Sequence, residues 1–131
     1  MKDAYGILSS DQVVTATAAS EDYIDFGAAG KSYGKWASGA GGLKVYADIK
    51  DVTVDVGEDI TVTIEDAAVV GTWATILTLA SAKSVADAIA DGEFVPPVGM
   101  PETHRRYVRA YYTCSTGTDT FSGTFNLWIA P

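Results

Sequence analysis

The side chains most able to do chemistry are a single histidine, His104, and a single cysteine, Cys114. A general base must reach its nucleophile at hydrogen-bond distance, and a third group usually orients it. The two residues flank a Tyr-, Val- and Thr-containing run typical of a strand, which would hold them about 33 Å apart. We therefore expect no His–Cys dyad. His104 is interpreted as a solvent-facing residue at a strand start, and Cys114 as a small, buried or half-buried residue.

Acidic residues form the densest group of candidate metal ligands. Five carboxylates belong to it: Asp48, Asp51, Asp55, Glu58 and Asp59. Oxygen ligands of this kind suit calcium, but the D-x-D-x-D-G order of an EF-hand loop is absent. Val52, Val54 and Val56 alternate between the acids, as they would in a strand. The pattern favours a solvated acidic face with a turn, and a metal site is the alternative.

Signature motifs of the common enzyme classes are absent. The chain contains no GxGxxG, no phosphate-binding loop, no HExxH, no GxSxG and no CxxC pair. Reactions of these classes need several groups that act together on one substrate. We therefore expect that the protein is not an enzyme and that it holds no catalytic residue, no cofactor and no metal.

Three arginines form the only dense basic group in the chain: Arg105, Arg106 and Arg109. In a strand, Arg105, Tyr107 and Arg109 point to the same face, because successive side chains alternate. Arg and Tyr are enriched at the energetic centres of protein interfaces, which would make this face a protein-binding surface. Pairing of the arginines with acidic residues on neighbouring strands explains the pattern equally well.

The three tryptophans could line a platform for a sugar ring, as in carbohydrate-binding modules. Such a platform needs two or three aromatic rings on one exposed face. Trp73 and Trp128 lie in strongly alternating segments, so we expect them in the core and only Trp36 at the surface. A carbohydrate-binding β-sandwich module is therefore the alternative function.

Size and charge restrict the possible partners. With 131 residues the chain is long enough for one domain with its own core, and we treat residues 1–131 as a single domain. Its formal net charge is −8, which disfavours binding to nucleic acid or to an anionic membrane. The chain has no apolar run of membrane-spanning length and no signal-peptide pattern, so we expect synthesis in a cytoplasm.

Alternating apolar residues predict strands along most of the chain. The strand-like runs are residues 12–17, 23–26, 43–49, 52–56, 60–66, 73–79, 103–113 and 120–130. Residues 84–92 have a capping-box-like start and a glycine stop, which predicts one short connecting helix. About eight strands at this spacing predict an all-β antiparallel sandwich or barrel.

Two segments lack a regular pattern. Residues 1–10 are expected to form an N-terminal arm, and residues 27–42 a glycine-rich surface loop. Arms that become ordered on docking can reach across the seam between two partner subunits. The apolar and aromatic side chains of these segments are Tyr5, Ile7, Leu8, Tyr33 and Trp36.

The two ends of the chain carry a recognisable series of short runs. Near the start are Met1-Lys2-Asp3-Ala4, Asp11-Gln12-Val13-Val14-Thr15 and Ile24-Asp25-Phe26-Gly27. Near the end are Pro101, Arg106-Tyr107-Val108-Arg109, Tyr112-Thr113 and Phe121-Ser122-Gly123-Thr124-Phe125. Together these runs, and the strand layout between them, resemble a family of tailed-bacteriophage capsid cement proteins, also called decoration proteins.

The resemblance implies a jelly-roll sandwich on the outside of a phage head, where it clamps neighbouring major capsid subunits. It also implies that the protein is part of the virion and acts as a homodimer or homotrimer, so that its partners are the major capsid protein and further copies of itself. Strong negative charge suits a protein that stays soluble before assembly. The candidate contact residues are Tyr5, Ile7, Leu8, Tyr33, Trp36, Arg105, Arg106, Tyr107 and Arg109.

Overall fold

The computed structural model describes residues 6–26, 43–54, 57–84, 89, 91–101, 104–115 and 121–130. Within these ranges the regular structure is all β, as the sequence predicts. The strands are β1 (Ile7–Val14), β2 (Ala18–Ala19), β3 (Ile24–Asp25), β4 (Lys44–Val54), β5 (Asp59–Ala67), β6 (Ala74–Ser84), β7 (Gly92–Gly99), β8 (Tyr107–Cys114) and β9 (Phe121–Ala130).

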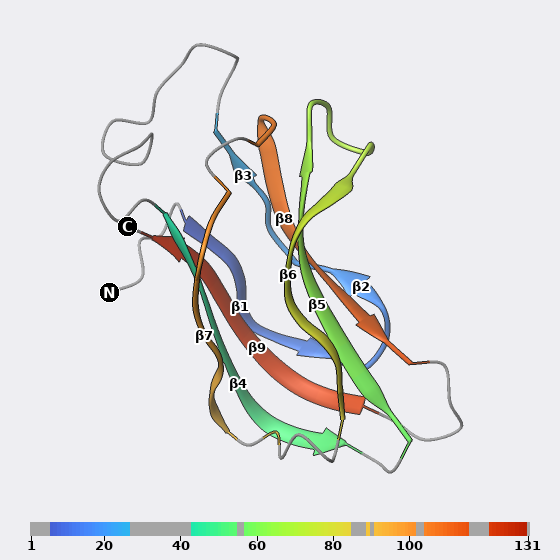
Figure 1. The fold of residues 1–131 in the computed structure, drawn as a ribbon. Helices are drawn as coiled ribbons and strands as arrows, with labels where there is room; N and C mark the ends of the chain where they lie inside the picture. The colour runs from blue at the N-terminus through green and yellow to red at the C-terminus, as the bar shows by residue number, and fades with distance from the viewer. Residues whose placement is uncertain are drawn as a thin grey trace.

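The strands form two facing antiparallel sheets (Figure 1). One sheet has four strands in the order β1-β9-β4-β7. The other has five, in the order β2-β8-β5-β6, and β3 also pairs with β8. The chain passes repeatedly from one sheet to the other, so most strands that follow each other in the sequence lie in different sheets. This interleaved order is that of a jelly roll, and it confirms the predicted jelly-roll-like sandwich.

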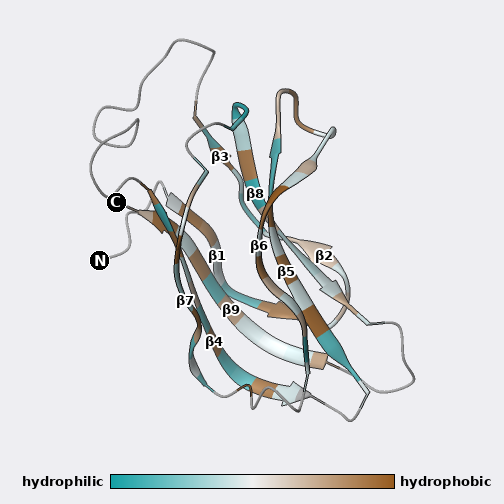
Figure 2. Ribbon diagram, in the orientation of Figure 1, coloured by the Kyte–Doolittle hydropathy of each residue, from teal (hydrophilic) through white to brown (hydrophobic). Residues whose placement is uncertain are grey.

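The alternation in the sequence sends apolar side chains to the space between the sheets. In β5, Ile60, Val62 and Ile64 are fully buried, and the residues between them are half-buried. In β8, Val108 and Ala110 are buried in the same way. Figure 2 shows apolar and polar segments succeeding each other along the strands of both sheets. Because strand side chains point alternately to the two faces, each sheet has one face in the core and one outside.

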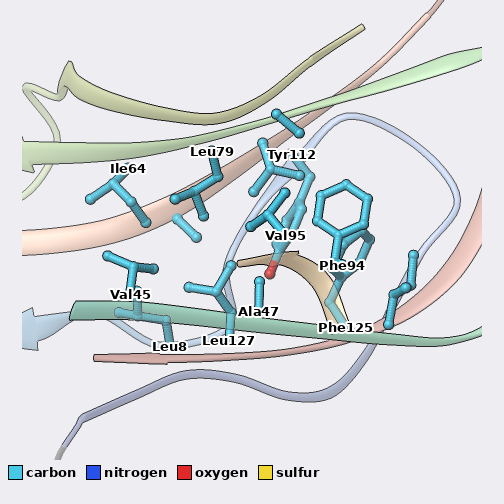
Figure 3. Packing of buried hydrophobic residues seen from close by; sticks show 14 of the residues in the cluster. Leu8, Val45, Ala47, Ile64, Leu79, Phe94, Val95, Tyr112, Phe125 and Leu127 are labelled. Atoms are coloured by element: carbon cyan, nitrogen blue, oxygen red, sulfur yellow. The ribbon is translucent and has the colours of Figure 1, made fainter. Parts of the chain in front are cut away.

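The core contains large side chains from both layers (Figure 3). Phe125 of β9 packs against aromatic rings of two other strands. Its ring centroid lies 4.7 Å from that of Tyr112 of β8 and 5.3 Å from that of Phe94 of β7. Leu127 and Val45 are fully buried beside them. Fully burying one such side chain stabilises the fold by about 1.5–3 kcal/mol, so this cluster is the main attraction between the two sheets.

A buried hydrogen-bond network also joins the layers. The hydroxyls of Ser9 in β1 and Tyr112 in β8 lie 2.8 Å apart, and Ser9 Oγ donates to Gln12 Oε1 at 2.7 Å. Gln12 Nε2 donates to the carbonyl of Ala19, and Gln12 Oε1 accepts from the Glu21 amide. Each polar atom of this network therefore has a partner, which offsets the cost of burying it.

One sequence prediction is changed by the fold, and another falls largely outside the described residues. Residues 7–10 are not part of an arm: they lie in β1, which pairs with β9, and Leu8 is fully buried in the core. The sequence of this short run of mixed polar and apolar residues does not show that β9 pairs with it and supplies its hydrogen bonds. The predicted helix over 84–92 falls mainly on residues 85–88 and 90, which lie outside the described part; at its two ends, Ser84 is the last residue of β6 and Gly92 the first of β7.

Candidate protein-binding surface

Strand β8 places a row of aromatic and basic side chains on the outer face of the five-stranded sheet. Tyr107, Arg109 and Tyr111 are half-buried and alternate with the buried residues Val108 and Ala110. Within β8, Tyr107 and Arg109 therefore share one face as predicted, whereas Arg105 precedes the strand. β8 lies between β5 on one side and β2 and β3 on the other, so its outward side chains meet residues from several segments.

Arg109 is held from three directions. It lies directly opposite Glu65 of β5, and its Nε donates to Glu65 Oε2 at 2.7 Å. Its guanidinium carbon lies 4.4 Å from the ring centroid of Trp73 and 5.2 Å from that of Tyr111. A planar guanidinium suits both an ion pair and contact with ring faces, so the side chain is fixed on the sheet surface.

Tyr23, in the segment before β3, extends this group of contacts. Its ring centroid lies 6.2 Å from Trp73 and 5.6 Å from Tyr107, in an edge-on arrangement with the latter. The guanidinium of Arg106 lies 5.0 Å from the Tyr107 ring. The result is one continuous group, here called the aromatic–arginine cluster: Tyr23, Trp73, Arg106, Tyr107, Arg109 and Tyr111.

Arg105 forms an ion pair with Asp66, whose side chain is almost fully buried. Its Nε and backbone N–H donate to the two carboxylate oxygens of Asp66 at 2.8 and 2.7 Å, and its Nη2 donates to the Asp66 carbonyl. Burial alone would raise the pKa of Asp66. The hydrogen bonds and charge of Arg105, with a smaller effect of His104, outweigh burial and hold that pKa below its usual value.

All three arginines of the basic group are paired with acids. Besides the two pairs above, Arg106 donates two hydrogen bonds to Asp25, at 2.7 and 2.9 Å, in a pair about 40% exposed on each side. Pairing with neighbouring strands was one of the two interpretations of this group. It is compatible with a binding role, because paired and stacked arginines are already ordered before a partner arrives.

Exposed apolar side chains gather beside the cluster. Val69 and Val70, in the turn between β5 and β6, are 69% and 49% exposed, and Tyr23 is 51% exposed. Figure 1 shows this hairpin, β3 and the start of β8 at the same end of the sandwich. Tyr23, Val69 and Val70 were not among the residues singled out from the sequence. An apolar pair between the strand-like runs 60–66 and 73–79 was the available signal for the hairpin tip.

Trp73 and Trp128 do not share a face. Trp73 belongs to the cluster on the five-stranded sheet, and Trp128 stacks on Tyr46 on the other sheet, with ring centroids 5.3 Å apart and planes 7° apart. Both are half-buried, which corrects the prediction that they lie in the core. Leu127 and Ile129, the neighbours of Trp128 in β9, are fully buried in the core, so the Trp128 side chain points outward. A platform built from Trp73 and Trp128 together is therefore excluded.

The remaining candidate contacts are dispersed. Ile7 is half-buried in β1 opposite Trp128, and Leu8 is fully buried, so Leu8 cannot contact a partner directly. Tyr5, Tyr33 and Trp36 lie outside the described residues.

His104 and Cys114 have separate structural surroundings. His104 is half-buried rather than solvent-facing: its ring lies 4.4 Å from Phe26, and its Nδ1 lies 2.8 Å from the Arg105 carbonyl oxygen. Cys114 is a buried free thiol, as expected. Burial, together with the charges of Glu58 and Asp59, raises the pKa of that thiol, which opposes nucleophilic use at neutral pH.

The acidic residues are divided between the layers. Asp48 and Asp51 lie in β4, whereas Glu58 and Asp59 lie at the start of β5 in the other sheet. Glu58 is buried and accepts a hydrogen bond from Ser115 at 2.6 Å. Among the described residues, no three His, Cys, Asp or Glu side chains converge on a possible metal position. Asp55 lies outside the described residues.

The described ranges also include no helix long and apolar enough to cross a membrane.

Comparison with known proteins identifies one family. The family model described as Bbp16 matches residues 8–129, which is almost the whole chain and includes every strand but the first residue of β1 and the last of β9. No curated protein matches the chain.

Proposed function

The chain belongs to the Bbp16 family, and we propose that it is a structural virion protein that binds the outer surface of a phage capsid. In this role it stabilises contacts between major capsid subunits, acts as a homodimer or homotrimer, and catalyses no reaction. Sequence and fold both support the proposal. Both ends of the chain resemble capsid cement proteins, and the fold is the jelly roll that this resemblance implies.

The observation that carries most weight is the aromatic–arginine cluster. Trp, Tyr and Arg are the residue types that contribute most to binding energy at protein interfaces. Here they are ordered by contacts with one another: Trp73 with Arg109, and Tyr23 with Tyr107. Ordered side chains lose little conformational entropy on binding, so more of the contact energy is available for adhesion.

A cement function needs only preferential binding to the assembled shell. A ligand that binds one state stabilises that state by RT ln(1 + [L]/Kd), or about 2.7 kcal/mol per site when its free concentration is 100 times Kd. Many sites on one shell multiply this effect. A rigid sandwich with an adhesive surface is sufficient for the role, and no reactive group is required.

The direct test is co-sedimentation with empty shells. Shells of the major capsid protein from the phage that encodes this chain would be prepared without it, expanded, and mixed with the purified protein. We expect saturable binding and a higher temperature of shell disruption. An unrelated acidic β-sandwich of similar charge is the control for adsorption. Failure to co-sediment, together with unchanged heat resistance, would contradict the proposal.

A further inference from the structure

We propose that the shell is contacted by one end of the five-stranded sheet, formed by Tyr23, Val69, Val70 and Trp73, and that the shell offers a basic surface with an aliphatic patch to it. This inference rests on the proposed cement function and names the docking surface and the chemistry of its partner. The four residues are called the docking end below.

Exposure of apolar side chains singles out the docking end. The large hydrophobic residues that are exposed in the described part of the chain are Val13, Tyr23, Val69 and Val70. Three of these belong to the docking end, and only Val13 lies on the four-stranded sheet. Single exposed apolar residues are ordinary, but a group of them beside half-buried aromatic rings is typical of an interaction site.

The docking end is rigidly supported. Near the end of β5, the backbone N–H of Arg105 donates a hydrogen bond to the Asp66 carboxylate. Across the turn, the Thr72 amide donates to the Val69 carbonyl at 3.3 Å. Trp73 packs on Arg109 at the other side of the hairpin. The valines therefore stand on a turn whose two strands are both fixed, so docking does not require the hairpin to become ordered.

Charge at this end determines the kind of partner. Glu21 and Asp22 are exposed beside Tyr23, and within the described ranges neither carboxylate forms an ion pair, whereas Arg105, Arg106 and Arg109 already have acidic partners. Among the described residues, the unpaired charges next to Tyr23 along the chain are therefore negative, and the whole chain carries a formal net charge of −8. Lys or Arg side chains of a partner would complement it. A second copy of this chain would instead bring its own acids to the same place.

The test compares two exposed valines on opposite layers. Val69→Asp should weaken co-sedimentation with expanded shells by roughly tenfold or more, because it places a charge in the apolar contact. Val13→Asp makes the same change at a residue of similar exposure on the other sheet, and we expect binding within about twofold of the wild-type value. Circular dichroism and urea unfolding verify that both variants are folded.

A second comparison tests the charge of the partner. The double variant Glu21→Gln/Asp22→Asn should weaken binding at low salt and reduce its salt dependence, because fewer charge pairs form across the interface. Asp48→Asn, an exposed acid on β4, is the matched control and should leave the salt dependence unchanged.

The outcomes separate the two proposals. If the wild-type protein does not bind shells, the cement function itself fails, and the docking end fails with it. If the wild type binds and Val69→Asp binds equally well, or Val13→Asp is equally impaired, the function stands and the docking end is wrong. If Val69→Asp lowers the oligomer mass in light scattering, this end is an interface between copies and the inference is also wrong.

Discussion

Asp66 and Arg105 are joined through side chain and backbone together: the guanidinium and the backbone N–H of Arg105 hold both carboxylate oxygens of Asp66. The Asp66 side chain is only 6% exposed, and that of Arg105 is 40% exposed. Since Arg105 directly precedes Arg106 and Tyr107, this pair fixes the start of β8 against the end of β5. This ion pair therefore adds to the strand pairing that positions the aromatic–arginine cluster.

Removing the Asp66 charge should destabilise the protein. Asp66→Asn leaves Arg105 without its carboxylate partner, and we expect the free energy of unfolding at pH 7 to fall by about 2 kcal/mol, less than for a fully buried pair because Arg105 stays in contact with water. Asp25→Asn breaks the exposed pair with Arg106 and should cost less than about 1 kcal/mol. Urea unfolding measures both, and equal losses would contradict the difference in burial.

The same pair should make stability depend on pH in the acidic range. The pKa of Asp66 is lower in the folded protein than in the unfolded chain, so its contribution is present above the unfolded value of about 3.9 and is lost as the pH falls through the folded value. Unfolding measured between pH 6 and pH 2, a range chosen for this purpose, should show a smaller loss of stability in Asp66→Asn than in the wild type. A parallel pH dependence of the two proteins would argue against this role.

Gly123 of β9 should not tolerate even one added carbon. A Cβ at this position would lie 2.8 Å from Ile49 Cδ1 and 3.2 Å from Phe121 Cζ, so Gly123→Ala should cost about 1–3 kcal/mol in urea unfolding. Gly99→Ala is the control, because nothing lies within 4 Å of its Cβ. Ile49→Val removes Cδ1, so the Gly123 substitution should cost less in that background. An undiminished cost would show that another contact is responsible.

The Ser9–Tyr112 hydrogen bond between the layers should show an asymmetry. Tyr112→Phe leaves Ser9 its bond to Gln12 and should cost about 1 kcal/mol, whereas Ser9→Ala leaves the buried Tyr112 hydroxyl without its partner and should cost more. The double variant should cost less than the sum of the two single variants, and additive losses would contradict a direct bond.

Burial also raises the pKa of Tyr112, so its phenol should stay protonated in alkaline titration until the protein unfolds.

Cys114 should react slowly with thiol reagents in the folded state. Its side chain is buried and its thiol pKa is raised, so little thiolate is present and access is poor. Iodoacetamide labelling at pH 7.5, a chosen condition, should be much slower in native protein than in urea, as followed by mass spectrometry. Similar rates in the two conditions would show that the end of β8 opens readily.

Most of the strand pattern could be predicted because it is local. Alternating residues in β5 and β8 must divide between two faces wherever those strands lie. The prediction failed where it depended on which face of a strand the second sheet covers. Trp128 alternates with the buried Leu127 and Ile129, but alternation alone does not say which face meets the second sheet, and Trp73 precedes β6 rather than lying within it. Leu8 failed for a related reason, since only pairing with β9 makes its segment a strand.

The amino-acid sequence by itself determined the class of this protein: an acidic, all-β protein whose apolar residues recur with a period of two. Tertiary structure alone decided where its surface chemistry gathers. Tyr23, Trp73 and Tyr107 are separated by tens of residues along the chain, and their rings meet because β3, the β5–β6 hairpin and the start of β8 lie at the same end of the sandwich. Strand periodicity is a local property of the backbone, whereas the meeting of distant side chains follows from the order in which strands pair.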